Sequence, residues 1–189
     1  MHCLITWPTG TGKTWTARQE AAEVLSSGGR VLVCVPLKAL AAELELEWGA
    51  ALPGVTVRAF TSDTRARAYQ DAQVLILTPE RLDLISRAWR RHHHWLAAAR
   101  LLIADEVHLL ADPVRGPRLD GAVTRLRAAY PLLRVMALSA TVGDPETLRA
   151  WLGAAHLPDR PRRTPLHWHA RTVPAARHKP AAQIGRAHV

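Results

Sequence analysis

Long apolar runs and cysteines are both scarce in this chain of 189 residues. No run of about 18 apolar residues occurs, which excludes a hydrophobic transmembrane helix. The first residues lack the charged, apolar and small segments of a secretory signal. The two cysteines, Cys3 and Cys34, lack C-x-x-C spacing, so a zinc site of the common kind is not predicted. Isolated cysteines within apolar runs indicate core residues in a reducing compartment, and we expect a cytoplasmic protein.

Lysine is also rare, with three Lys against 22 Arg. The net charge of +9 is unevenly distributed along the chain. Residues 1–155 carry 18 Lys and Arg against 15 Asp and Glu, whereas residues 156–189 carry seven against one. A high isoelectric point often indicates a nucleic-acid partner. Because most of the excess lies in the last 34 residues, the charge of the main domain is only a weak indication of such a partner.

Residues 7–14, which read WPTGTGKT, have the pattern of a phosphate-binding loop. Such a loop wraps backbone N–H groups around phosphates, its Lys reaches the β- and γ-phosphates, and the next hydroxyl holds Mg²⁺. Trp7 stands where the general pattern has its first glycine, while Gly10 and Gly12 remain to form the turn. We predict a strand over residues 2–6 and a helix over residues 14–27, which is the context that the loop requires. A chance match in a turn rich in Gly and Thr is the alternative.

Short apolar runs alternate with amphipathic segments through the rest of the domain. We predict further strands over residues 30–35, 55–60, 74–77, 101–104 and 134–138. We predict helices over residues 37–48, from Thr78 as N-cap onward, over 118–130, and from the Asp144 cap to residue 152. In the first of these helices, one apolar stripe is formed by Leu37, Leu40, Ala41, Leu44 and Trp48. This order is typical of an α/β fold with a mostly parallel sheet and helices on both faces. Ligands bind such sheets at the carboxyl ends of the strands, and the phosphate-binding loop and the other polar motifs of the chain all begin at such an end.

Polar side chains follow two of the predicted strands. Asp105 can hold a metal ion beside the phosphates, and Glu106 can orient and deprotonate an attacking water. Ser139 and Thr141 follow the strand over residues 134–138, where their hydroxyls can hydrogen-bond His108 or the acidic pair. The alternatives are an acidic pair that caps the next helix and an ordinary turn at residues 139–141.

Taken in order, these motifs resemble the first RecA-like domain of superfamily-2 helicases. The resemblance is strongest to the DExH branch, which includes the Ski-type RNA helicases and the archaeal repair helicases. It covers about residues 3–173, and the segments that carry it are residues 8–14, 36–40, 78–83, 105–108 and 138–141, with further support from residues 108–116 and 142–152. It implies a RecA-like P-loop NTPase fold.

The resemblance implies a role for each matched position. The ATP site would be formed by Thr9, Gly10, Thr11, Gly12, Lys13 and Thr14. Lys13, Asp105 and Glu106 would be catalytic, and Thr14 and Asp105 would hold Mg²⁺. His108, Ser139 and Thr141 would couple the ATP state to the grip on nucleic acid. The backbone of one strand would be contacted by Pro36, Leu37, Lys38, Thr61, Asp63, Thr78, Pro79, Glu80, Arg81 and Arg115. Without the family order, Lys38 and Arg81 would be interpreted as solvated helix charges.

The resemblance also divides the chain. Residues 1–155 correspond to the first RecA-like domain, and residues 156–173 to a strand and linker that lead toward a second RecA-like domain, which we expect to be missing. We expect a disordered tail over residues 174–189, of which residues 184–189 read like a translated sequencing adapter. Because the second domain supplies arginines to the ATP site, and few residues precede Trp7 to recognise adenine, we expect slow hydrolysis and little unwinding by this chain alone.

The sequence therefore predicts the first motor domain of a helicase or translocase that uses ATP and Mg²⁺. Its expected partner is single-stranded or partly duplex nucleic acid. Two alternatives remain: a module that grips nucleic acid in response to nucleotide without turnover, and a P-loop ATPase unrelated to nucleic acid. Nothing in the motifs favours DNA over RNA, because no contact to a 2′-hydroxyl can be assigned.

Overall fold

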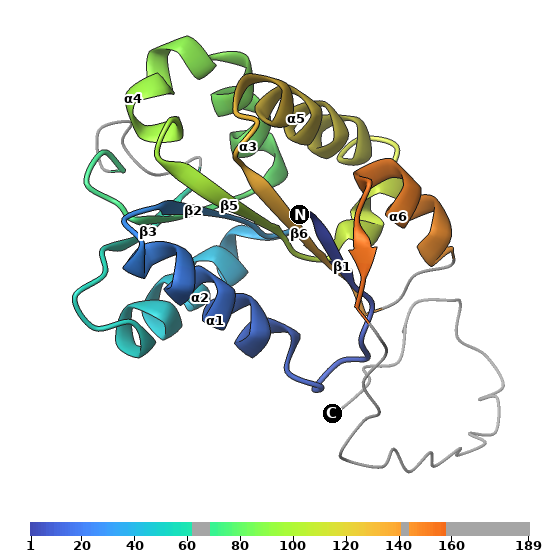
Figure 1. Cartoon of the computed structure of the whole chain (residues 1–189), viewed down its shortest axis with the longest axis horizontal. Coiled ribbons are helices and arrows are strands. Elements are labelled where there is room, and N and C mark those ends of the chain that lie inside the picture. The colour runs from blue at the N-terminus through green and yellow to red at the C-terminus, as the bar shows by residue number, and fades with distance from the viewer. Residues whose placement is uncertain (62–68, 141–143, 158–189) are drawn as a thin grey trace, which may run out of the picture.

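The protein folds as one parallel sheet between two layers of helices (Figure 1). The computed structural model describes residues 1–61, 69–140 and 144–157. The predicted site residues Asp63 and Thr141, and the segments predicted beyond residue 157, lie outside the described residues.

The elements follow the predicted alternation closely. The strands are β1 (Cys3–Ile5), β2 (Arg30–Cys34), β3 (Val57–Phe60), β4 (Val74–Leu77), β5 (Ala99–Ala104), β6 (Arg134–Leu138) and β7 (Ala155–His156). The helices are α1 (Lys13–Ser26), α2 (Lys38–Ala51), α3 (Pro79–Arg87), α4 (His93–Leu96), α5 (Gly116–Ala129) and α6 (Pro145–Leu152), with 3₁₀ turns η1 (Trp89–His92) and η2 (Val107–Ala111).

Within the described residues the sheet has seven strands in the order β3-β4-β2-β5-β6-β1-β7, and every pair is parallel. The predicted α/β fold with a mostly parallel sheet is confirmed. Two backbone hydrogen bonds extend the ladder past the strand ends: Val35 N donates to Leu77 O and Asp105 N donates to Cys34 O, each at 2.8 Å. The loops that follow β2, β4 and β5 therefore start side by side at one edge of the sheet.

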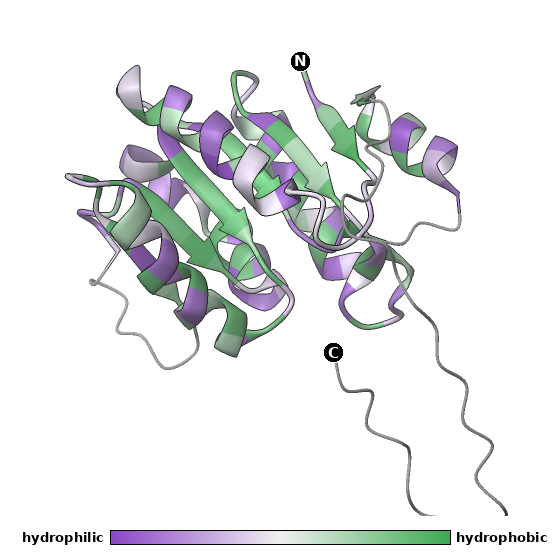
Figure 2. Ribbon diagram, turned by 90° about the horizontal axis from the view of Figure 1, so that it is seen from below, coloured by the Kyte–Doolittle hydropathy of each residue, from purple (hydrophilic) through white to green (hydrophobic). Residues whose placement is uncertain are grey.

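Alternating side chains of the strands fill two separate cores. In β4, Val74 and Ile76 join the core that faces α1 and α2, whereas Leu75 and Leu77 join the core that faces α3, α4, α5 and α6. This period of two is the direct result of the strand pleat. Figure 2 shows the strands as hydrophobic, while polar residues lie along the helices that cover them. Burial on both faces explains why these strands read as continuous apolar runs.

The helix ends test the capping predictions. The Asp144 carboxylate accepts hydrogen bonds from Glu146 N at 3.0 Å and Thr147 N at 3.2 Å, and Gly153 ends α6 in the left-handed region with φ 62°. Thr78 is the N-cap of α3, as predicted, but its side chain forms no capping hydrogen bond. The prediction that Leu37 belongs to the apolar stripe of α2 is wrong. Leu37 is the extended N-cap of that helix, so its side chain leaves the stripe and is 54% exposed.

Both cysteines are free thiols. Cys34 is buried at the end of β2, and burial raises the pKa of its thiol strongly. Cys3 is half-buried in β1, where burial raises its pKa to about 11. In the part of the chain that the structure describes, no helix is both long and apolar enough to cross a bilayer.

Gly116 permits the close approach of α5 to η2. A Cβ atom at Gly116 would lie 2.2 Å from the Leu110 carbonyl oxygen, which is backbone and cannot rotate away. We therefore expect Gly116→Ala to lower the free energy of unfolding by about 2 kcal/mol, as overpacking does. Urea denaturation followed by circular dichroism would measure it.

Gly49→Ala in α2 is the matched control. Apart from the backbone of its own helix, no atom of the described residues lies within 4 Å of a Cβ at that position, so the substitution should raise stability by about 0.5 kcal/mol through helix propensity. Equal changes in the free energy of unfolding at the two glycines would show that the contact between Gly116 and Leu110 does not limit the side chain at position 116.

Candidate functional site

The loop between β1 and α1 turns through two glycines with left-handed backbone. Gly10 has φ 78° and Gly12 has φ 95°, a region that residues with a side chain rarely adopt. Gly12 is also the N-cap of α1, so the helix begins directly at the turn. Thr11 Oγ1 donates a hydrogen bond to Pro8 O at 2.6 Å, which closes the loop on itself. A tight turn that leads into a helix N-terminus suits an anion, because the first N–H groups of a helix lack helical partners.

Lys13 folds back onto the start of this loop. Its Nζ donates hydrogen bonds to the carbonyl oxygens of Trp7 at 2.7 Å and Pro8 at 3.2 Å. The Trp7 side chain is only 6% exposed and lies in the core beside α1 and α2. The residue that replaces the first glycine of the general pattern thus anchors the loop in the core, and its carbonyl group holds the lysine.

The acidic pair follows β5 at the same edge of the sheet. Asp105 Oδ1 accepts a hydrogen bond from Glu106 N at 2.9 Å. Glu106 has φ 51° and ψ 49°, and it is the residue other than glycine with positive φ in the described part of the chain. A left-handed backbone is unfavourable for a residue with a side chain, so its occurrence here indicates a local constraint.

The loop and the acidic pair line one cavity. It has a volume of about 370 Å³ and is bounded by Thr9, Gly10, Gly12, Lys13, Thr14, Asp105 and Glu106. The structure therefore brings the predicted loop residues, apart from Thr11, together with Asp105 and Glu106. Among the described residues that line it, Lys13 is the one cation.

The electrostatics of this cavity favour a cation near the carboxylates. Burial raises the pKa of the Asp105 carboxyl above its usual value, the Glu106 carboxylate raises it further, and Lys13 opposes the shift. The Oε2 atom of Glu106 is buried, and its polar neighbour at 3.1 Å is Nδ1 of His108. A bound cation would stabilise both ionised carboxylates, since its positive charge offsets their mutual repulsion and their loss of hydration.

The donor set of the cavity fits magnesium. The Thr14 hydroxyl and the Asp105 carboxylate are hard oxygen donors, which Mg²⁺ prefers, together with water and phosphate oxygens. Three or more His, Cys, Asp or Glu side chains do not gather into a metal cage anywhere in the described ranges. Mg²⁺ does not require such a cage, because it is usually held by one or two carboxylates plus the phosphates of a substrate.

His108 connects the acidic pair to β6. Its Nδ1 lies 3.2 Å from Oγ of Ser139 and 3.1 Å from Oε2 of Glu106. Ser139 is fully buried, and its N–H donates to Ile5 O at the end of β1 at 2.9 Å. The expected contact between the Ser139 hydroxyl and His108 is therefore present, and it links the ends of β5, β6 and β1.

The described residues that were predicted to contact nucleic acid lie along the other half of the same edge. Residues 36–38 join β2 to α2, Thr78 and the first turn of α3 follow β4, and Thr61 follows β3. The Arg81 guanidinium lies over the Phe60 ring, 4.8 Å from its centroid. These loops are adjacent because β2, β4 and β3 are neighbours in the sheet.

Arg115 joins two of these loops. Its Nη1 donates a hydrogen bond to the carbonyl oxygen of Pro36 at 3.4 Å, and its Nε lies 3.9 Å from Oε1 of Glu80. The Nη1 of Arg118 lies at the same distance from that carboxylate oxygen. Arg118 was not among the predicted site residues. Its spacing of three residues from Arg115 on a helix was the available signal, since residues three apart share a face.

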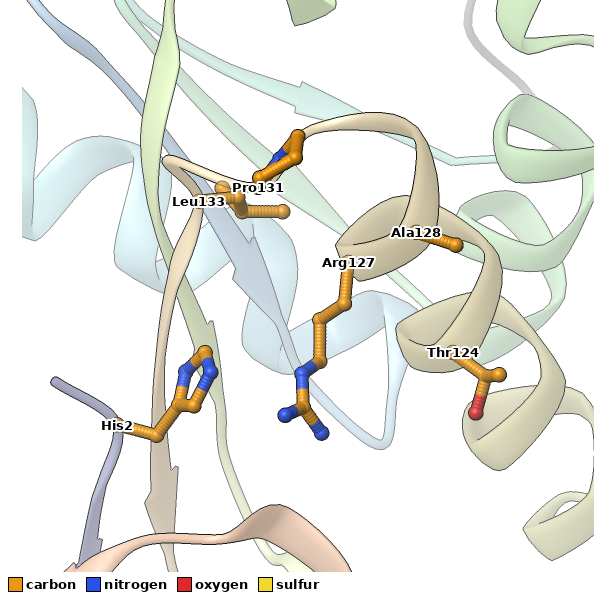
Figure 3. A pocket seen from close by; sticks show the side chains of 6 residues that line it. All are labelled: His2, Thr124, Arg127, Ala128, Pro131 and Leu133. Atoms are coloured by element: carbon orange, nitrogen blue, oxygen red, sulfur yellow. The ribbon is translucent and has the colours of Figure 1, made fainter.

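A second cavity, of about 390 Å³, lies at the opposite edge of the sheet (Figure 3). It is lined by His2, Thr124, Arg127, Ala128, Pro131 and Leu133. His2 Nδ1 accepts a hydrogen bond from Val135 N at 3.0 Å. Burial, followed by the Arg127 charge, lowers the pKa of His2. None of the predicted site residues that the structure describes lines this cavity, and it lies at the amino ends of β1 and β6, where parallel sheets seldom bind ligands.

Comparison with known proteins gives matches over most of the chain. The DEAD/DEAH box helicase family matches residues 1–149. The ATP-dependent DNA helicase Hel308 of Methanocella arvoryzae is 35% identical over 173 residues, which covers 87% of this chain and 23% of that protein. Hel308 of Pyrobaculum calidifontis is also 35% identical, over 86% of this chain and 23% of that protein. The ATP-dependent DNA helicase MER3 of Saccharomyces cerevisiae is 29% identical, over 80% of this chain and 13% of that protein.

Solved helicase structures superpose on most of this chain. The helicase domain of Pyrococcus furiosus Hef superposes with a TM-score of 0.70 at 26% identity, over 86% of this chain and 35% of that one. MrfA, described as a DUF1998 helicase and solved with DNA and AMPPNP, superposes with a TM-score of 0.72 at 19% identity, over 82% of this chain and 24% of that one. The second match shows the fold alone.

The chain spans about a quarter of the length of the Hel308 proteins that it matches. Strands β1 to β6, the loop before α1 and the Asp105–Glu106–Val107–His108 segment lie within the residues that the family matches. The chain therefore belongs to the DEAD/DEAH box helicase family, as the first RecA-like domain of a DExH-type superfamily-2 helicase.

Proposed function

We propose that this chain is the ATP-binding motor domain of an ATP-dependent helicase or translocase that acts on single-stranded nucleic acid. The observation that carries the proposal is the single cavity shared by the loop before α1 and the acidic pair after β5. The pairing of β7 with β1, which ends at His156, supports a domain boundary near residue 155. In this proposal the following residues lead toward a second motor domain.

The triphosphate would lie in the loop, against the N-terminus of α1. Lys13 would exchange its two carbonyl partners for β- and γ-phosphate oxygens, and the backbone N–H groups between Thr9 and Thr14 would donate to the remaining oxygens. This exchange is favourable because a charged acceptor forms a stronger hydrogen bond than a neutral carbonyl group. Thr14 and Asp105 would hold Mg²⁺, which neutralises charge on the phosphates.

Glu106 is proposed as the group that activates water. Its carboxylate would orient a water molecule and accept its proton as the water oxygen bonds to the γ-phosphorus. The bond from that phosphorus to the bridging oxygen would break, and ADP would leave with the electron pair. The left-handed backbone at Glu106 supports this role, since strained residues cluster at functional sites. His108 and Ser139 would carry changes around this carboxylate to β6.

Nucleic acid is proposed to lie across the loops that follow β2, β3 and β4. Backbone N–H groups at the starts of α2 and α3, with Lys38 and Arg81, would contact phosphates without reading sequence. Hel308 and MER3 are named ATP-dependent DNA helicases, and MrfA is described as bound to DNA, so single-stranded DNA is the first substrate to test. Matched RNA forms the second arm of the same experiment.

We expect Glu106→Gln to abolish turnover while it preserves nucleotide binding. Gln keeps the shape of the side chain but cannot accept the proton, and loss of a general base lowers rates by about 10²-fold or more. Phosphate release in the presence of single-stranded DNA would measure turnover, and a fluorescent ATP analogue would measure binding.

Turnover by the unsubstituted chain should itself be slow. Lys13 is the one cation among the described residues that line the cavity, whereas a transition-state arginine accelerates related reactions by about 10³-fold or more. Glu146→Gln on the outer surface of α6 is the control, since the Glu146 carboxylate pairs with Arg149 of the same helix, away from the cavity. Equal hydrolysis by the Glu106 and Glu146 variants would refute the assignment.

We expect Asp105→Asn to stabilise the nucleotide-free protein and to remove stabilisation by Mg²⁺ and ATP. The folded protein raises the pKa of the Asp105 carboxyl, so the folded state holds this proton more tightly than the unfolded state does. Stability is therefore lost as the pH rises from the ordinary value of 3.8 through the raised one. The amide has no charge to bury and still accepts the Glu106 N–H bond.

Thermal unfolding across this pH range, with and without Mg-ATP, tests the Asp105 prediction. The midpoint of the variant should exceed that of the unsubstituted protein near neutral pH, and the two should converge at acid pH. A lower midpoint for the nucleotide-free variant at neutral pH would show that the ionised carboxylate is not penalised.

We expect Lys38→Gln with Arg81→Gln to weaken binding to single-stranded DNA about tenfold and to reduce its salt dependence by about two phosphate contacts. Fluorescence anisotropy of a labelled strand at several salt concentrations would measure both quantities. Arg127→Gln, at the opposite edge, removes a charge of the same sign and should change affinity much less. If the Lys38/Arg81 double variant and the Arg127 variant bind single-stranded DNA equally well, the loops after β2 and β4 are not the nucleic-acid surface. The chain would then be a P-loop ATPase that does not bind nucleic acid through these loops.

A further inference from the structure

Arg115 occupies a position between three functional segments. Its Nη1 bonds to the Pro36 carbonyl oxygen at 3.4 Å, and its Nε faces the Glu80 carboxylate at 3.9 Å. Pro36 belongs to the loop after β2, and Glu80 to the first turn of α3. Arg115 itself ends the segment that begins at Glu106. One side chain thus touches both proposed nucleic-acid loops and is joined by a short stretch of chain to the proposed catalytic residue.

The backbone around Arg115 is firmly held. Oδ1 of Asp112 accepts hydrogen bonds from Val114 N and Arg115 N, both at 2.8 Å. Gly116 N donates to Asp112 O at 2.9 Å, and the close approach of Gly116 to Leu110 O fixes α5 against η2. A displacement of η2 would therefore also displace the Cα atom of Arg115, because these hydrogen bonds leave the intervening loop little freedom to change conformation.

The charge of Glu80 requires an explanation. A carboxylate among loops that face a polyanion opposes binding, because it repels phosphates and neutralises nearby arginines. Glu80 is 41% exposed and its two arginine partners lie at 3.9 Å, so the ion pairs contribute little to stability. A positional role would account for an acidic residue at this place.

We propose that Arg115 and Glu80 are positioning residues that clamp the loop after β2 to the first turn of α3 and tie both to the segment after Glu106. The clamp keeps the N–H groups and cations of the two loops at a fixed spacing along the strand. Through η2 it carries changes at the ATP cavity into the same two loops. This inference rests on the proposed function, and it changes the implied role of Arg115 and Glu80 from contact with phosphates to placement of the loops.

The sign of the Glu80→Gln effect separates the two roles. Removal of a negative charge should strengthen binding to single-stranded DNA if Glu80 acts only through its charge. The clamp predicts the opposite: Glu80→Gln should weaken binding about fivefold, the lower end of typical coupling between sites. Arg115→Gln should weaken it similarly, and the double variant should be no weaker than either single variant, because both break one clamp.

Arg118→Gln is the matched control. Arg118 lies at the same distance from the Glu80 carboxylate and its substitution removes the same charge, but within the described residues its hydrogen bonds do not include Pro36 O. Fluorescence anisotropy with a labelled single strand, for the full chain and all four variants, gives the comparison. Weakening by Glu80→Gln but not by Arg118→Gln would support the clamp, and tighter or unchanged binding by Glu80→Gln would overturn it.

Amide hydrogen exchange gives a reading without nucleic acid. Arg115→Gln should speed exchange in peptides that cover residues 37–41 and 80–83, whereas Arg118→Gln should not. Unchanged exchange in both peptides would overturn the clamp even if binding weakens. If the unsubstituted chain binds no single strand, the proposed function fails and this inference falls with it. If that chain binds and only the Glu80 and Arg115 predictions fail, the proposed function stands without the clamp.

Discussion

The parallel alignment of the strands is the constraint on which the site depends. Asp105 N donates to Cys34 O, and Val35 N donates to Leu77 O, so β5, β2 and β4 end in register. Every loop that leaves a carboxyl end then starts from the same edge. Residues far apart in the sequence, from Lys13 to Ser139, come together because the backbone ladder fixes where each strand stops. The side chains at that edge therefore depend on a main-chain interaction that they do not form themselves.

Several groups at this edge are held in arrangements whose energetic cost a bound ligand would reduce. The Asp105 carboxylate is buried beside another carboxylate, Glu106 has a left-handed backbone, and Lys13 is paired with neutral carbonyl groups. The buried carboxylate and the left-handed backbone are unfavourable in isolation, and the surrounding sheet maintains them. A site of this kind is organised before its ligand arrives, so the ligand gains the relief of these interactions as part of its binding free energy.

The sequence predicted β1 to β6 because strands depend on local patterns, and it predicted the pocket because the loops after parallel strands share one edge. The apolar runs of β4 and β6 and the caps of α6 follow from the period of the side chains and from turn chemistry. It did not predict that Leu37 lies outside the apolar stripe of α2, because a shift of one residue in the start of the helix turns that side chain toward solvent. Nor did it reveal the pairing of Arg115 with Glu80, because an ion pair between two elements depends on which helix turns lie side by side.

Cys34 gives this edge a chemical reporter of its own. The thiol is buried, and burial keeps its pKa high, so alkylating reagents cannot reach or activate it in the closed protein. Its carbonyl group accepts the Asp105 N–H, while its side chain lies in the core that faces α3, α4, α5 and α6, so the thiol becomes accessible when that core opens. The rate of alkylation at Cys34, measured separately from that at Cys3, would then report how often the core beneath the carboxyl end of β2 opens.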